Sequence, residues 1–178
     1  MNLLRKTWGI VIAVIISSCH SGTFDTISPD GTLKVGVVTT KDGDYGKAAF
    51  VVHYKGDSIL FRSELGLETD AQKFAGNLRL KSVSEPKSVI DDYKMITGKR
   101  SHCVNEASER VYSLENDEGQ TLEVTFRVYN DGVAFKYGLK AISDEEHIIN
   151  EYTAYALPQG SKRWIQQYDP GYEKFFPL

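Results

Sequence analysis

Two pairs of adjacent carboxylates, Asp91-Asp92 and Glu145-Glu146, are the first residues in the sequence that could do chemistry. Carboxylates that cleave a glycosidic bond must flank that bond from opposite sides, about 5 to 9.5 Å apart on a rigid frame. Neighbouring acids in a strand point to opposite faces of the sheet, and in a loop they repel each other into water. We therefore expect neither pair to be catalytic.

The histidines and cysteines could provide a metal site or a nucleophile. His53, His102 and His147 are scattered without the spacing of a zinc site. Arg100-Ser101-His102-Cys103 could hold a Cys–His nucleophile pair, but neighbouring residues of a strand diverge. We expect Cys103 to be a buried, inert thiol. His102 with Glu106 is a His–Glu pair that could act as general acid and base, and it defines the weakest of three functional hypotheses.

The composition limits the kind of protein that can position these residues. The chain has 178 residues, of which 41% are hydrophobic and 11% aromatic, and a formal charge of −3. This length suits one domain and is too short for a barrel of roughly 250 residues with anything attached. Two cysteines do not make a disulfide-rich scaffold, and the mildly acidic balance gives no reason to expect a nucleic-acid partner.

Residues 1–18 have the three parts of a secretory signal. Arg5 and Lys6 precede an apolar run from Trp8 to Ile16, which is shorter than the ~20 residues that span a bilayer. Ile16-Ser17-Ser18-Cys19 is similar to a bacterial lipobox, so we expect Cys19 to be acylated and residues 19–27 to form a tether. The protein would then be exported and held in the cell envelope by its lipid. An ordinary signal peptide with an incidental cysteine is the alternative.

Residues 28–178 are predicted to form an all-β domain, an antiparallel sandwich. Runs such as Leu33–Val37 and Thr121–Val128 alternate apolar and polar side chains, and turn residues recur every 8–12 positions. Lys55-Gly56-Asp57 and Asn130-Asp131-Gly132 predict hairpins, the second with the positive φ that Asn and Gly accept. A helical turn or a strand remains open for residues 144–152. The apolar ending Phe175-Phe176-Pro177-Leu178 predicts that the sandwich is incomplete at its C-terminus.

Several stretches in order resemble the N-terminal domain of glycoside hydrolase family 97. The most specific is Phe126–Tyr137, which contains Tyr-Asn-Asp-Gly-Val-Ala-Phe; the others are Ser28–Gly31, Tyr54–Asp57 with Ile59-Leu60, Leu65-Gly66-Leu67, Gly98-Lys99-Arg100 with Asn105-Glu106, Glu151-Tyr152-Thr153 and Leu157-Pro158. The resemblance implies a mutarotase-like β-super-sandwich. It also implies a partner, a calcium-dependent (β/α)₈ barrel that hydrolyses α-glucosides or α-galactosides and carries the catalytic carboxylates. This chain lacks the barrel, so we expect it to be inactive alone.

The resemblance also implies roles for residues near the end of the chain. Glu173 matches a calcium ligand at the active-site mouth, with Glu151 as the alternative. Ca²⁺ needs six to eight oxygens, so this chain alone should not hold it tightly. Trp164, Tyr168 and Tyr172 could stack on sugar rings, but we favour an interface with the barrel. The second functional hypothesis is a stand-alone sugar-binding lipoprotein of the cell envelope.

Overall fold

The protein is entirely β in the part of the chain that the computed structural model describes, which comprises residues 26–42, 45–140, 143–162 and 171. No membrane-spanning helix occurs within these residues. The strands are β1 (Thr26–Ile27), β2 (Leu33–Asp42), β3 (Tyr45–Tyr54), β4 (Asp57–Leu65), β5 (Leu67–Thr69), β6 (Lys73–Phe74), β7 (Leu78–Val83), β8 (Lys87–Lys94), β9 (His102–Asn116), β10 (Thr121–Tyr129), β11 (Val133–Leu139) and β12 (Ile148–Glu151). The predicted all-β class is confirmed.

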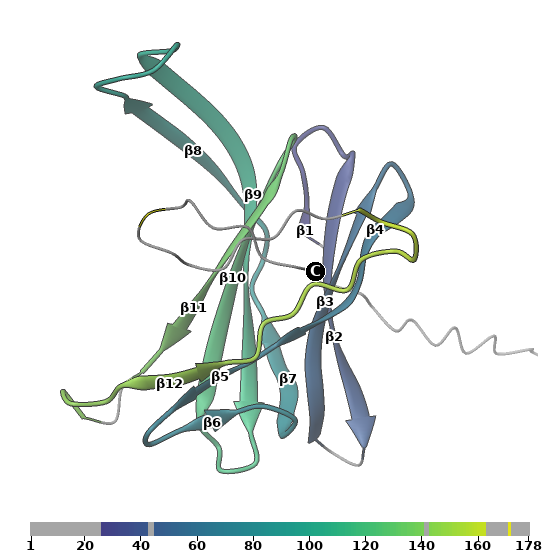
Figure 1. Cartoon of the computed structure of the whole chain (residues 1–178), viewed down its shortest axis with the longest axis vertical. Coiled ribbons are helices and arrows are strands. Elements are labelled where there is room, and N and C mark those ends of the chain that lie inside the picture. Colours follow the sequence, from purple (N-terminus) through teal and green to yellow (C-terminus); the bar gives the residue numbers. More distant parts are fainter. Residues whose placement is uncertain (1–25, 43–44, 141–142, 163–170, 172–178) are drawn as a thin grey trace, which may run out of the picture.

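The strands form two antiparallel sheets (Figure 1). The large sheet has the order β1-β2-β3-β7-β9-β10-β11, with β4 also paired to β3 and β8 also paired to β9. The small sheet has the order β12-β5-β6 and crosses one end of the large sheet. Leu67 and Phe74 of the small sheet belong to the same buried cluster as the large sheet's core, which makes the arrangement sandwich-like.

The core follows from the alternation in the strands. Leu122, Val124, Phe126 and Val128 of β10 are fully buried, whereas the residues between them are exposed or half-buried. β2 behaves in the same way, because Leu33, Val35 and Val37 all point into the core. An aromatic cluster fills the centre, with ring centroids 5.3–5.8 Å apart: Phe50, Tyr112, Phe126, Phe135 and Tyr137. Apolar area removed from water in this way is the main stabilising contribution to such a domain.

Both predicted hairpins are present, but only one has the expected backbone. Lys55 and Gly56 have φ values of 51° and 96°, as a two-residue hairpin turn requires. None of Asn130, Asp131 and Gly132 has a positive φ, so the expectation for that turn was wrong. A tertiary contact uses Asn130 instead: its Oδ1 accepts a hydrogen bond of 3.0 Å from the backbone N–H of Asp30.

The structure settles one segment that the residue pattern left open and shows a feature of β8 that the pattern did not predict. The open choice for residues 144–152 is resolved as a strand, β12, at Ile148–Glu151. β8 shows little alternation of burial, because much of it pairs with β9 away from the rest of the sheet. Residues 88–106 form a two-stranded hairpin that projects from the sandwich, at the top left of Figure 1. We call residues 88–106 the arm.

Candidate functional site

Three stretches of the sequence that lie far apart along the chain meet at Gly66, between β4 and β5. The backbone N–H of Gly66 donates to the hydroxyl of Tyr137 at 3.1 Å, and the carbonyl of Gly66 accepts from the N–H of Tyr152 at 2.9 Å. The hydroxyl of Tyr137 also shares a hydrogen bond of 2.8 Å with the Thr153 hydroxyl. We call Gly66, Tyr137, Tyr152 and Thr153 the junction.

Only glycine fits at the centre of the junction. A Cβ on Gly66 would lie 2.6 Å from the carbonyl oxygen of Phe74 and 3.1 Å from the Cβ of Tyr152. The first distance is far inside van der Waals contact, and the obstacle is backbone that cannot move alone. The close approach of β6 and of the chain after β12 therefore explains why a glycine stands between Leu65 and Leu67.

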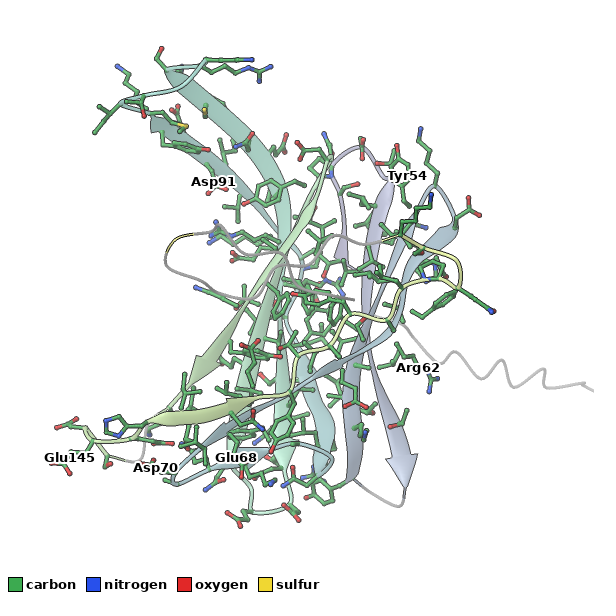
Figure 2. All side chains as sticks on the ribbon, viewed as in Figure 1. Tyr54, Arg62, Glu68, Asp70, Asp91 and Glu145 are labelled. Carbon is green, nitrogen blue, oxygen red and sulfur yellow. The ribbon has the colours of Figure 1, made fainter. Side chains whose placement is uncertain are left out.

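Charged groups contact Tyr152 of the junction, and one of them, Glu68, is labelled in Figure 2. The hydroxyl of Tyr152 donates to Glu68, and the ammonium of Lys73 donates to Glu68 Oε1 at 3.1 Å. The hydrogen bond from Tyr152, followed by that from Lys73, lowers the pKa of Glu68, and Glu68 in turn raises the pKa of Lys73. Burial is the largest influence on Tyr137 and raises its pKa. A hollow of about 260 Å³ opens beside these groups, lined by Lys47, Glu64, Leu65, Lys73, Ala75, Gly76 and Tyr152.

The junction directs the chain that follows it. Beyond Thr153 the chain runs alongside β4, where the Ala154 N–H donates to the Glu64 carbonyl at 3.0 Å and the Phe61 N–H donates to the Ala156 carbonyl at 2.8 Å. Described residues continue to Lys162. The junction therefore sets where the chain lies as it approaches residues 163–173.

A second polar cluster joins the arm to the sandwich. Arg127 of β10 donates to Glu109 at 2.6 Å and to Asp91 at 3.0 Å, and the Tyr129 hydroxyl donates to Asp91 at 2.6 Å. The hydrogen bond to Glu109 is the largest cause that raises the pKa of Arg127, and the charge of Asp91 raises it further. The hydrogen bond to Asp91 raises the pKa of Tyr129. The hydrogen bonds that Asp91 of β8 accepts from β10 pass over β9, which lies between these two strands. At this point β9 carries the small, fully buried Ala107, which pairs with Tyr129. A hollow of about 240 Å³ lies alongside, lined by Thr125, Arg127, Tyr129, Ala134, Phe135 and Lys136.

The carboxylates of both polar clusters accept hydrogen bonds from neighbouring side chains of the domain. Glu68 accepts from Tyr152 and Lys73, and Glu109 accepts from Arg127. Within the described ranges, no three His, Cys, Asp or Glu side chains gather as a metal would need. Glu151, the alternative calcium ligand, is an exposed residue of β12.

Five residues of interest from the sequence lie outside the described residues. They are Cys19, Trp164, Tyr168, Tyr172 and Glu173. Their expected roles in lipidation, interdomain or sugar contact, and calcium binding stay predictions.

The adjacent carboxylates behave in two different ways. Asp91 and Asp92 point to opposite faces of β8, since Asp91 meets Arg127 while Asp92 meets His102 at 2.6 Å. Glu146 does not turn into water as expected. Its Oε1 accepts from Thr69 at 2.5 Å and from Gln72 at 2.8 Å, because the chain before β12 packs on the loop after β5.

The structure does not bring together the His102–Glu106 or His102–Cys103 pairs. His102 and Glu106 are four residues apart on extended β9, roughly 13 Å along the strand, and Glu106 accepts instead from Ser88 at 3.3 Å. Cys103 is half-buried rather than buried, and it lies opposite Tyr93 in the arm. The distance along extended β9 thus removes the support for an acid–base role of the His102–Glu106 pair.

Sequence reasoning missed the junction as a unit. Leu65-Gly66-Leu67, the Phe126–Tyr137 stretch and Glu151-Tyr152-Thr153 were each singled out by their residues, but nothing in one sequence indicates that they touch. An unexplained glycine between two leucines was the only local signal, since glycine inside a strand pattern is typical of a close backbone approach.

Comparison with known proteins agrees with this architecture. The sequence model described as "Glycosyl-hydrolase 97 N-terminal" matches residues 27–177. The "Probable retaining alpha-galactosidase" of Streptomyces bingchenggensis (strain BCW-1) is 28% identical over 184 residues, covering 98% of this chain and 28% of that protein.

Two solved structures have a similar fold over about three quarters of this chain. A β-arabinopyranosidase crystal structure is 30% identical, with a TM-score of 0.68 over 75% of this chain and 21% of the other. A glycoside hydrolase family 97 enzyme from Pseudoalteromonas sp. strain K8, solved in complex with panose, is 21% identical, with a TM-score of 0.64 over 76% of this chain and 20% of that one. Fold and comparisons define an antiparallel sandwich, and the chain spans 28% of the length of the Streptomyces relative and about a fifth of each solved structure. The chain belongs to glycoside hydrolase family 97 and corresponds to the family's N-terminal domain.

Proposed function

We propose that this chain is the non-catalytic, carbohydrate-associated N-terminal part of an α-glucosidase or α-galactosidase. In this proposal it packs on a calcium-dependent (β/α)₈ barrel and contributes to the mouth of the active site. The observation that supports the proposal most is the match to the family's N-terminal model over residues 27–177. The junction adds that three separate stretches of this domain are held together by hydrogen bonds. Chemistry itself would come from the barrel, and in this domain Glu109 and Glu68 are already engaged by Arg127 and Tyr152.

The test begins with the chain alone. We expect no hydrolysis of nitrophenyl α-glucosides or α-galactosides and no tight Ca²⁺ binding in a calorimetric titration, because one or two carboxylates do not make a calcium site. Turnover of either substrate by the purified chain would contradict the proposal. A measurable oligosaccharide affinity without a barrel would favour the stand-alone sugar-binding alternative.

Glu173 is the proposed calcium ligand that this domain contributes. A hybrid in which this chain replaces the matched 28% of the Streptomyces relative allows a direct test. If that hybrid is active, Glu173→Gln should weaken the Ca²⁺ dependence of its activity, whereas Glu151→Gln on exposed β12 should leave it unchanged. An equal effect of both substitutions would reject the assignment. Trp164, Tyr168 and Tyr172 are proposed to line the interface with the barrel, in keeping with the amphipathic character of such residues at interfaces.

Export and lipid anchoring are a separate part of the proposal. We propose that residues 1–18 are removed and that Cys19 carries the lipid that holds the domain in the cell envelope. Labelled fatty acid should enter the protein in a bacterial host and should not enter a Cys19→Ser variant, with Cys103→Ser as the matched control. Incorporation that survives Cys19→Ser would reject the anchor.

A further inference from the structure

The arm is an unpartnered surface. β10 pairs with β9 only as far as Ala107, so from the Ile90–Glu106 pair to the tip the two strands of the arm have, among the described residues, no strand beside them other than each other. Exposed apolar side chains lie on both faces and at the tip: Ile90, Tyr93, Met95, Ile96 and Val104, with Ile96 102% exposed. A two-stranded hairpin on its own is marginally stable in water, so these side chains would gain from a partner.

The tip of the arm is also basic. Residues 93–101 contain Lys94, Lys99 and Arg100 and no acid, although the whole chain has a formal charge of −3. All three cations are exposed, and none of them has an ion pair within the described residues. The partner that fits this tip therefore presents carboxylates around apolar side chains.

The same chain presents carboxylates around exposed apolar side chains at the end of the molecule opposite the arm (Figure 1). Residues 143–151 include β12, an edge strand of the small sheet with β5 as its paired neighbour. Ile148 and Ile149 are 67% and 61% exposed, and the segment contains no Lys or Arg. Its exposed acids are Asp144, Glu145 and Glu151. We call residues 143–151 the acidic edge.

We propose that the arm tip of one copy binds the acidic edge of a second copy, and that the reverse contact closes a two-fold dimer. Figure 1 shows the arm and β12 reaching toward the same side of the molecule from its opposite ends. In the proposed dimer, a half-turn about an axis beyond that side would bring each arm tip to the partner's acidic edge. Both contacts then form at once, as a closed isologous dimer requires.

The reciprocity is what favours a second copy over another partner. The arm tip combines cations with exposed Met95 and Ile96, and the acidic edge combines carboxylates with exposed Ile148 and Ile149. Each chain therefore carries both of the complementary surfaces. The second contact of a pair forms at high effective concentration, which strengthens two individually small contacts. Asp91, held by Arg127 and Tyr129, fixes the base of the arm and so limits the entropy lost when the tip docks.

Sedimentation velocity on the purified full-length chain tests the dimer. We expect a concentration-dependent dimer at low salt, whose dissociation constant rises roughly tenfold in high salt because exposed charges are screened. Lys99→Glu with Arg100→Glu should abolish it, and so should Asp144→Lys with Glu145→Lys. Lys34→Glu with Lys162→Glu is the matched control on exposed lysines elsewhere and should leave it intact. The apolar N-terminal run is common to all samples, so differences between variants report the arm and the acidic edge.

Charge exchange separates this dimer from other associations. An equimolar mixture of the two reversed variants should form a heterodimer. In that pair the acidic tip of one variant meets the basic edge of the other, and the unaltered basic tip meets the unaltered acidic edge. A chain that carries all four reversals should dimerise with itself. Ile96→Ser should weaken the dimer about tenfold without changing the thermal stability of the monomer. A chain that stays monomeric at low salt, or reversed variants that fail to rescue each other, would overturn the proposal.

Discussion

The junction and the arm are both built from antiparallel strands and tyrosines, yet they differ in how their polar and apolar groups are used. At the junction, backbone and hydroxyl groups of Gly66, Tyr137 and Thr153 bond to one another in a half-buried setting. In the arm, Tyr93, Ile96 and their neighbours face water and have no third strand. A two-stranded hairpin is marginally stable in water, so we expect packing against a third element to make the junction more stable than the arm.

The largest effect is expected from filling the centre of the junction. Gly66→Ala places a Cβ 2.6 Å from the Phe74 carbonyl, so we expect a loss of about 3 kcal/mol in the free energy of unfolding, or failure to fold. Gly132→Ala is the control, because no atom lies within 4 Å of its would-be Cβ and its φ is not left-handed. Urea unfolding of both variants measures the contrast. Equal stabilities would show that the backbone at Gly66 gives way easily.

A smaller loss should follow from removing one hydroxyl. Tyr137→Phe leaves the Gly66 N–H and the Thr153 hydroxyl without their partner, so we expect about 1–3 kcal/mol of destabilisation. Tyr93→Phe in the arm removes an equivalent hydroxyl from a 48% exposed side chain and should change stability by less than about 0.5 kcal/mol. The same unfolding assay separates the two, and a neutral Tyr137→Phe would mean that water replaces the hydroxyl.

Loosening the arm at its base should have a modest and local effect. Asp91→Asn weakens the contacts with Arg127 and Tyr129, which are only partly shielded from water, so about 0.5–1 kcal/mol is expected. Amide hydrogen exchange should accelerate in residues 88–106 and stay unchanged at the junction. Faster exchange throughout the domain would contradict the view that the arm is a separate unit.

The smallest effect is expected from acid. The pKa of Glu68 is lowered in the folded protein by Tyr152 and Lys73. Its contribution to stability is therefore fully present above its ordinary pKa of 4.5 and is lost as the pH falls through the lowered value. The melting temperature of Glu68→Gln should approach that of the unaltered chain below about pH 4 and fall slightly behind it at neutral pH. A difference that grows toward acid would reverse the sign and reject the assignment.

The sequence predicted those features that depend on residues close together along the chain, and it missed those that depend on distant residues. Alternation along Thr121–Tyr129 and the Lys55-Gly56 turn are local, so β10 and the β3–β4 hairpin were predictable. The arm was not, because a hairpin exposed on both faces has no buried side to leave a pattern. Glu146 was misplaced for a related reason, since its partners Thr69 and Gln72 are over seventy residues away along the chain.

The sequence by itself determined the all-β class, the main turns and the membership of family 97, because periodicity, turn chemistry and ordered motifs are properties of neighbouring residues. Only the tertiary structure decided that three of those motifs share one hydrogen-bonded junction at Gly66 and that residues 88–106 stand clear of the sandwich. Side-chain contacts across 70 or more residues depend on how the sheets pack, and packing is a property of the whole fold.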